Sequence, residues 1–281
     1  MESLTKFWGF YFVAVPDANG VGVHDLRDAL LGVARDYEWV SDLRPLSLEK
    51  RVIQSQLNSS IASHLFKKVL AARLMVFELF LELAIKIDGE LLEKRKRTWL
   101  LFQSQDDINP QVGTTHPFGR VIENCLRNAS TDALDVLLTR FDPICAKYLP
   151  PKRFIIALDE AHQAIRLYPH SFTSCVDAEV LRSTLRELVA VFTKLPGKLV
   201  VSGTGLPLED LLDYLAPGVS KAIGMISFFH DLGMFDTWPK LKQFLERYFP
   251  TSFLESPSGQ LLQRRIREYL LGRRVDSFIF N

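Results

Sequence analysis

The segment RFIIALDEAH, residues 153–162, decides how the rest of the sequence is interpreted. It runs from an unbroken apolar stretch into two adjacent carboxylates, Asp159 and Glu160, and then into a histidine. A continuous apolar run of this length is typical of a strand buried on both faces of a parallel sheet. Ligands bind at the carboxyl ends of such strands. The two acids therefore stand where a parallel α/β sheet places its active site.

Other apolar runs predict the rest of the sheet and the helices between its strands. Strands are expected over 9–15, 98–103, 154–158 and 198–204, and helices over 24–38, 48–87, 118–148 (two, broken near 128–130), 176–194, 207–215 and through most of 226–281. Alternating strands and helices predict a three-layer α/β/α fold with a mostly parallel sheet. In that sheet the ends of 154–158 and 199–203 lie side by side.

The domain organisation follows from a long helical segment between the first two strand candidates. Residues 48–87 contain neither proline nor glycine, so they predict one long helix, or two joined near 58–60, that covers the sheet or projects from its edge. We expect an α/β core over 1–225, with a helical insertion over 44–90, and a helical C-terminal part over 226–281.

Composition excludes several classes of protein. The 34 lysines and arginines nearly balance the 33 aspartates and glutamates, so no overall charge attracts the chain to nucleic acid or an anionic membrane. The three cysteines, Cys125, Cys145 and Cys175, match neither a disulfide framework nor a zinc-site spacing. No uncharged apolar stretch is long enough for a membrane helix. The apolar run near the N-terminus lacks the cleavage site of a secretory signal, so we expect a cytoplasmic or nuclear protein.

Asp159 and Glu160 are candidates for metal and water chemistry. In P-loop nucleotidases an acid at a strand end helps to hold the magnesium that bridges the β and γ phosphates. Glu160 would then orient or deprotonate the attacking water. In a competing interpretation both acids cap the following helix, whose N-terminal dipole favours carboxylates.

A second strand end carries hydroxyl groups. The segment KLVVSGTG, residues 198–205, places Ser202 and Thr204 at the tip of its strand. Hydroxyls there can donate hydrogen bonds to the attacking water or to a γ-phosphate oxygen. The same residues are also good turn formers, which is the alternative.

A family resemblance rests on four segments in a fixed order. They are WGFYFVAVPDANGVGVHDL (8–26), FIIALDEAHQAI (154–165), VVSGTGLPLEDL (200–211) and YLLGRR (269–274). In this order they resemble the P-loop ATPase domain of the Crinkler-type proteins of fungi and oomycetes. The resemblance implies a STAND-like or AAA-like ATPase core that acts on ATP with Mg²⁺.

The resemblance also implies a role for each matched site residue. Asp159 and Glu160 take the Walker B role, with Asp159 at the metal and nucleotide. Ser202 or Thr204 acts as the sensor of the phosphate state, and Thr204 also touches the nucleotide. Arg273 and Arg274 match the position of an arginine sensor near the γ-phosphate.

The phosphate cradle of this family is missing from the sequence. No segment matches G-x-x-x-x-G-K-[ST], whose backbone amides and lysine hold the phosphates. Because the resemblance begins at the second strand, the first strand and the P-loop would precede Met1. We therefore expect a truncated member of the family, with weak or no nucleotide binding unless the P-loop is supplied.

Two other functions compete with this interpretation. Residues 159–162 spell the DEAH box of a helicase, and 202–204 are similar to its later Ser-Ala-Thr motif, but too little chain remains after them for a second α/β lobe. The other alternative is a non-catalytic domain that binds protein partners or associates with itself.

A basic run precedes the second strand candidate. Lys94, Arg95, Lys96 and Arg97 fit a nuclear import signal or a nucleic-acid patch, and they fit equally a solvated turn. No aromatic residues are interleaved with them, so nucleic-acid binding has no support from stacking.

Overall fold

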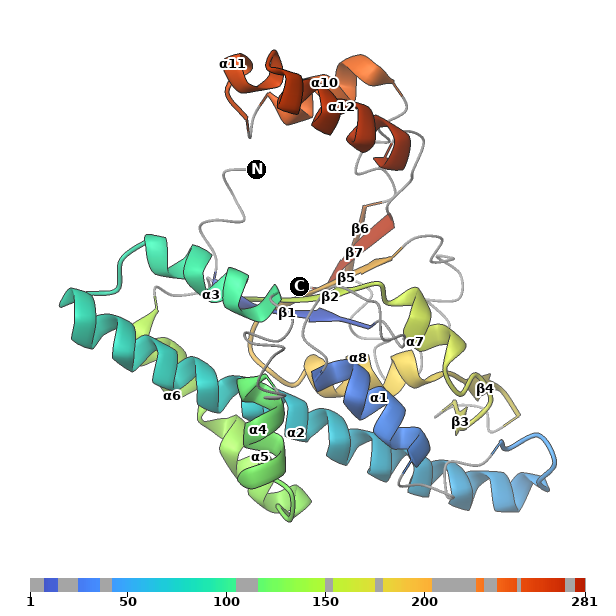
Figure 1. Ribbon diagram of the computed structural model, residues 1–281. Coiled ribbons are helices and arrows are strands. Elements are labelled where there is room, and N and C mark those ends of the chain that lie inside the picture. Colours follow the sequence, from blue (N-terminus) through green and yellow to red (C-terminus); the bar gives the residue numbers. More distant parts are fainter. Residues whose placement is uncertain are drawn as a thin grey trace.

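The computed structural model describes a mixed α/β protein (Figure 1). The described residues are 8–14, 25–35, 42–104, 116–149, 154–174, 179–203, 226–229, 237–246, 249–270 and 276–280. Within them the strands form one main sheet and one short two-stranded ribbon.

The main sheet has five strands, of which three are parallel. Its order is β1 (Trp8–Val13), β2 (Phe154–Asp159), β5 (Lys198–Gly203), β7 (Asp276–Phe280) and β6 (Ile226–Phe229). Strands β1, β2 and β5 run parallel, whereas β7 is antiparallel to both β5 and β6. The predicted pairing of β2 with β5 is therefore confirmed. The sheet was predicted to be mostly parallel, but only β1, β2 and β5 are parallel in it.

The described helices are α1 (Asp25–Arg35), α2 (Leu48–Asp88), α3 (Lys94–Ser104), α4 (Pro117–Asn124), α5 (Thr131–Thr139), α6 (Phe141–Tyr148), α7 (His162–Arg166), α8 (Thr184–Phe192), α10 (Trp238–Leu245), α11 (Thr251–Leu254) and α12 (Pro257–Leu270). Helix α2 is the long helix that the sequence predicted, in one piece. It ends where Gly89 takes up a left-handed conformation, with φ at 79°, and donates its N–H to the carbonyl of Ile85.

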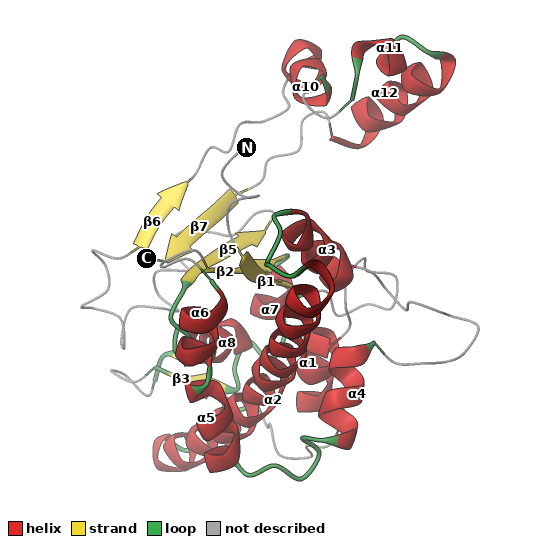
Figure 2. Ribbon diagram, turned by 90° about the vertical axis from the view of Figure 1, so that its left-hand side faces the viewer, coloured by secondary structure: helices red, strands yellow, loops and turns green. Residues whose placement is uncertain are grey.

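The helices α1, α2 and α8 lie on one face of the sheet (Figures 1 and 2). Large side chains of the strands point to this face, where Phe10 packs on Phe77 of α2 and Phe12 packs on Phe192 of α8. Along β1, β2 and β5 fully buried residues alternate with half-buried ones. The described part therefore shows helices against one face, and the second helical layer of the expected α/β/α fold is not seen in it.

Several predictions for individual segments differ from the structure. Residues 98–103 belong to helix α3, because Trp99 and Gln103 are one helical turn apart and both reach β1. A short apolar run such as this one is ambiguous between helix and strand. In 118–148 the predicted break near 128–130 is present, between α4 and α5, but the number of helices is three and not two. Pro143 has no N–H with which to continue α5 and is tolerated only in the first turn of α6.

The helix expected over 176–194 is also shorter than predicted. Its described part, α8, comes after β4 (Leu181–Arg182), which pairs with β3 (Phe172–Thr173). Ser55 of α2 accepts a hydrogen bond of 2.8 Å from the backbone N–H of Thr173, so the ribbon is held against the long helix.

The C-terminal part is not purely helical. Helices α10, α11 and α12 are present, but 226–229 and 276–280 form strands of the main sheet. The boundary predicted at residue 225 therefore does not separate the sheet from the C-terminal part of the chain. The short runs ISFF (β6) and SFIF (in β7) are rich in residues that favour strands. Only the pairing of β7 with β5 and of β6 with β7 shows which structure they adopt. The helix predicted over 207–215 lies outside the described residues.

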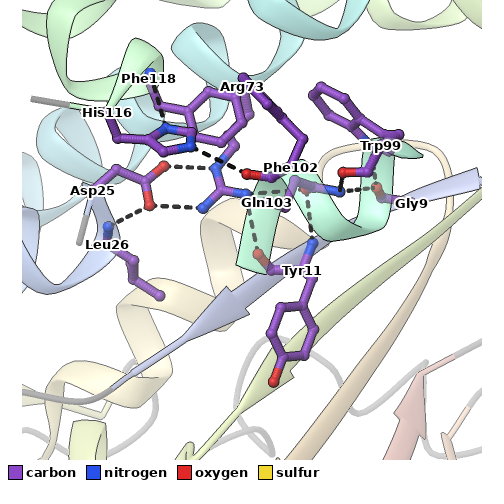
Figure 3. Close-up of polar contacts among 10 residues, drawn as sticks. All are labelled: Gly9, Tyr11, Asp25, Leu26, Arg73, Trp99, Phe102, Gln103, His116 and Phe118. Carbon is purple, nitrogen blue, oxygen red and sulfur yellow. Dashed lines mark hydrogen bonds and ion pairs between the residues drawn. The ribbon is translucent and has the colours of Figure 1, made fainter. Parts of the chain in front are cut away.

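A buried ion pair joins α1, α2 and β1 (Figure 3). The guanidinium of Arg73 donates two hydrogen bonds to Asp25, from Nε at 2.6 Å and from Nη2 at 2.7 Å. Their side chains are 1% and 0% exposed. The guanidinium also lies between two aromatic rings, 4.5 Å from the centroid of Phe12 and 4.1 Å from that of Phe118. The positive charge of Arg73 is thus compensated by the carboxylate of Asp25 and by the faces of the two rings.

The side chain of Gln103 closes the outer edge of β1. Its Oε1 accepts from the N–H of Tyr11 at 3.1 Å and its Nε2 donates to the carbonyl of Gly9 at 3.1 Å. Trp99 also donates to Gly9, and Arg73 Nη1 donates to Gln103 Oε1 and to the carbonyl of Tyr11. An open strand edge carries unpaired backbone groups that invite pairing with other chains. Here side chains from α2 and α3 satisfy those groups (Figure 3).

We expect Arg73→Met to lower the free energy of unfolding by about 3–5 kcal/mol, because it leaves the carboxylate of Asp25 buried without its partner. Urea denaturation monitored by circular dichroism measures the change. Arg140→Ala is the matched control, since it removes an ion pair with Glu78 whose arginine is half exposed, and it should cost no more than about 1 kcal/mol. The double variant Asp25→Leu/Arg73→Met should be more stable than Arg73→Met. If Arg73→Met lowers the free energy of unfolding no more than the control does, the pair does not contribute to stability as expected.

Gly9→Ala should also destabilise the protein, by at least about 2 kcal/mol. An added Cβ would lie 2.2 Å from the backbone carbonyl oxygen of Ile155 on β2, and backbone atoms cannot give way as a flexible side chain can. Gly197→Ala is the control, because its Cβ would have no neighbour nearer than 3.4 Å. Thermal unfolding of the two variants should separate them clearly, and equal melting temperatures would be inconsistent with this close approach of β1 and β2.

Candidate functional site

Three donors hold the carboxylate of Asp159 at the end of β2. Ser202 on β5 donates from Oγ to Oδ1 at 2.7 Å, and Tyr11 on β1 donates from its hydroxyl to Oδ2 at 2.9 Å. The backbone N–H of Glu160 donates to Oδ1 at 2.9 Å. The predicted proximity of Asp159 and Ser202 is confirmed, and the centre draws one side chain from each of the three parallel strands.

The pleat and register of the strands explain this cluster. Leu158 pairs with Val201, so the next residues along, Asp159 and Ser202, are neighbours on the same face. Tyr11 pairs with Ala157 and reaches Asp159 diagonally. All three polar residues point away from α2 and α8, to the half-buried face of the sheet. The cluster therefore lies on the side of the sheet that these helices leave open.

Tyr11 is a site residue that the sequence analysis missed. Burial raises the pKa of its hydroxyl, and the negative charge of Asp159 and the hydrogen bond to it act in the same direction. The hydroxyl therefore stays protonated and donates to Asp159 over the ordinary pH range. Its position between Phe10 and Phe12 is typical of an apolar strand, and only the pairing of β1 with β2 shows the role of its hydroxyl.

Glu160 adopts an unusual backbone conformation immediately after the strand. Its φ is 54°, in the left-handed region that is unfavourable for a residue with a side chain of this kind. Its carbonyl accepts from the N–H of Gln163 at 2.9 Å, and the next N–H, of Ala161, donates to the carbonyl of Ser202 at 2.9 Å. The side chain is 40% exposed, and its Oε2 lies 3.2 Å from Nδ1 of His162. Strain of this kind clusters at functional sites.

The capping interpretation of the two acids is wrong for the following helix. The residue that caps α7 is Ala161, and no side-chain capping hydrogen bond is present there. The side chain of Asp159 is turned instead to the neighbouring strands, and that of Glu160 to His162.

The remaining predicted site residues cannot be placed around this centre. Thr204, Arg273 and Arg274 lie outside the described residues. Within the residues that are described, no group of three or more histidine, cysteine, aspartate or glutamate side chains could hold a metal ion.

The basic run lies in the first turn of α3, so the interpretation as a turn before a strand is wrong. Lys94 and Arg95 form ion pairs with Asp88, at 3.4 and 2.5 Å, and Lys96 pairs with Glu93 at 2.7 Å. Much of the positive charge of the run is therefore compensated locally.

Comparison with known proteins adds no relative: no family model, curated protein or solved structure matches the chain. None of the helices in the described part is both long enough and apolar enough to cross a membrane.

The strain at Glu160 can be tested by Glu160→Gly. Glycine adopts positive φ at little steric cost, although it also gives more freedom to the unfolded chain. We expect the variant to be as stable as the parent, or more stable by up to about 1 kcal/mol. Urea denaturation measures this, with Glu255→Gly, an exposed residue of ordinary helical φ at the end of α11, as the control that should lose stability. A clear loss of stability in Glu160→Gly would show that its left-handed conformation is not strained.

Proposed function

We propose that the chain is a Crinkler-type, P-loop NTPase-like domain in which Asp159 serves as the Walker B acid for Mg²⁺ and ATP. The observation that carries the proposal is the position of Asp159 at the carboxyl end of the middle strand of the parallel part of the sheet, bonded to the hydroxyl of Ser202 on the next strand. Carboxyl ends of parallel strands are where such sheets bind ligands.

The donors around Asp159 are compatible with a magnesium ion. An ionised carboxylate has about four lone-pair positions, and three of them receive the hydrogen bonds of Tyr11, Ser202 and Glu160. One position remains for a cation, while the Oγ of Ser202 keeps its own lone pairs. Mg²⁺ is commonly held by one or two carboxylates, with water and phosphate oxygens as its other ligands. When bound, it would neutralise charge on the phosphates.

Glu160 supplies the second function of the pair. Its half-exposed carboxylate comes directly after Asp159 and can accept a proton from a water molecule near a metal held by Asp159. We propose that it orients the attacking water, while Ser202 donates to the phosphate when it is not bonded to Asp159. The assignments of Thr204 as the second sensor hydroxyl, and of Arg273 and Arg274 at the γ-phosphate, belong to the same proposal.

The affinity for nucleotide should be low. Backbone amides and a lysine localise the triphosphate in P-loop proteins, and the sequence contains no motif that supplies them. Asp159 and Glu160 can polarise metal and water only when these are already held beside them. We therefore propose a domain that is weakly active or inactive until a phosphate-binding element is added.

A non-catalytic domain is the second candidate, and one observation favours it. The carboxylate of Asp159 joins β1, through Tyr11, and the end of β5, through Ser202, to β2, as a purely structural contact would also do. In this case the domain would bind protein partners or a second copy of itself. Dependence of nucleotide binding on Asp159 separates the two candidates.

Calorimetric titration of the full chain with ATP and Mg²⁺ tests the proposal. We expect a dissociation constant on the order of 0.1–1 mM, which corresponds to a binding free energy of about 4–5.5 kcal/mol. Asp159→Asn and removal of Mg²⁺ with EDTA should each weaken binding at least about tenfold, because both remove the metal contact. Glu160→Gln should retain binding and lose any turnover, because the amide cannot accept the proton.

Asp132→Asn on the exposed start of α5 is the control for the loss of one negative charge, and it should change nothing. Circular dichroism checks that Asp159→Asn is folded. Absence of any heat of binding would favour the non-catalytic candidate, binding that is insensitive to Asp159→Asn would locate the nucleotide elsewhere, and turnover that RNA stimulates would favour the DEAH-type helicase.

A further inference from the structure

The side chain of His162 lies beside the proposed catalytic pair without a role in it. His162 is the first residue of α7, and its side chain is only 13% exposed. Its Nδ1 lies 3.2 Å from Oε2 of Glu160, and its Nε2 lies 2.9 Å from Nε2 of Gln163. The imidazole therefore stands between a carboxylate and an amide.

The neighbours of the ring determine which nitrogen carries the proton. An amide nitrogen can only donate, so the tautomer that fits this contact accepts at Nε2 of His162 and carries its proton on Nδ1, facing Glu160. This N–H is close to the carboxylate but is not aligned with it, and within the described residues the buried Nδ1 has no aligned hydrogen bond. The contact is therefore an electrostatic attraction between a donor and a carboxylate.

We propose that His162 is a positioning residue that holds the carboxylate of Glu160 in a resting orientation, from which it must turn to reach water at Asp159. The inference rests on the proposed function for the role of Glu160 in hydrolysis. Among the described residues no hydrogen bond or ion pair joins the carboxylate of Glu160 to Asp159, Tyr11 or Ser202, whereas its contact with His162 is present.

The backbone of Glu160 limits how this change can occur. Its N–H is bonded to Asp159, its carbonyl accepts from Gln163, and the next peptide group is bonded to β5. The left-handed φ of 54° leaves the backbone little freedom, so reorientation is confined to the side-chain torsions. A carboxylate with two possible partners and a fixed backbone can alternate between two rotamers.

The strength of the contact is suited to a reversible restraint. Because the Glu160 side chain is 40% exposed, the solvent screens its attraction to His162. A pair of this exposure shifts the population of rotamers by about fivefold or less. A ligand that attracts Glu160, or a water molecule ordered at Asp159, can therefore overcome it.

Nuclear magnetic resonance of the full chain tests the contact itself. In ¹⁵N spectra of the imidazole at pH 8, we expect Nδ1 to be the protonated nitrogen of His162 and its signal to move in Glu160→Gln. Glu255→Gln, at a distant exposed glutamate, should leave it unchanged. In spectra with ¹³C-labelled glutamate side chains, the carboxylate signal of Glu160 should shift in His162→Ala and return toward the parent position in His162→Asn, which keeps a donor. Protonation on Nε2, or no response to Glu160→Gln, would overturn the proposal.

Kinetics then separate the positioning of Glu160 from the proposed function. With ATP and Mg²⁺, His162→Ala should raise kcat by about twofold to fivefold, because Glu160 is released from its resting orientation. KM should stay unchanged, since His162 does not touch the nucleotide in this scheme. An equal change in KM and kcat would contradict a positioning role. If no turnover is detected in any variant while the ¹⁵N and ¹³C responses are as expected, the role of His162 in hydrolysis fails and only the restraint of Glu160 stands. The proposed function fails separately, when binding of ATP does not depend on Asp159.

Discussion

The buried pair of Arg73 and Asp25 is the interaction on which the rest of the structure depends. Its guanidinium contacts the first helix through Asp25, the first strand through the carbonyl of Tyr11, and α3 through Gln103 (Figure 3). Burying a charge without compensation is costly, so these elements can pack only in the arrangement that satisfies it. Tyr11 connects this pair to the candidate site. Its backbone is held by Arg73 and Gln103, and its hydroxyl donates to Asp159.

The two faces of the sheet differ in chemical character. One face is filled with aromatic and aliphatic side chains that pack on α2 and α8, and it supplies the hydrophobic stabilisation of the core. The other face is half-buried in β1, β2 and β5, and it carries the polar centre around Asp159. Alternation along each strand makes this separation possible, because neighbouring residues point to opposite faces. A polar site can therefore be built within strands whose other residues form the core.

The tip of β2 combines rigidity with strain. Asp159 accepts three hydrogen bonds, and the backbone of Glu160 is tied to Asp159 and Gln163. This network maintains the left-handed conformation of Glu160, which is unfavourable by itself. The side chain of Glu160 is 40% exposed, and its Oε2 lies 3.2 Å from Nδ1 of His162. Such an arrangement fits both a catalytic acid pair and a structural turn. Whether binding of nucleotide depends on Asp159 distinguishes the two.

The sequence by itself determined the elements whose patterns are unambiguous. Apolar runs predicted β1, β2 and β5, forty residues without a helix breaker predicted α2, and the polar strand ends predicted that Asp159 and Ser202 meet. Only the tertiary structure decided that 98–103 is helical, that 226–229 and 276–280 complete the sheet, and that Tyr11 and His162 belong to the site. Short apolar segments fit a helix or a strand equally well until a neighbour pairs with their backbone. A contact between residues far apart in the chain depends on register and packing, which no local pattern contains.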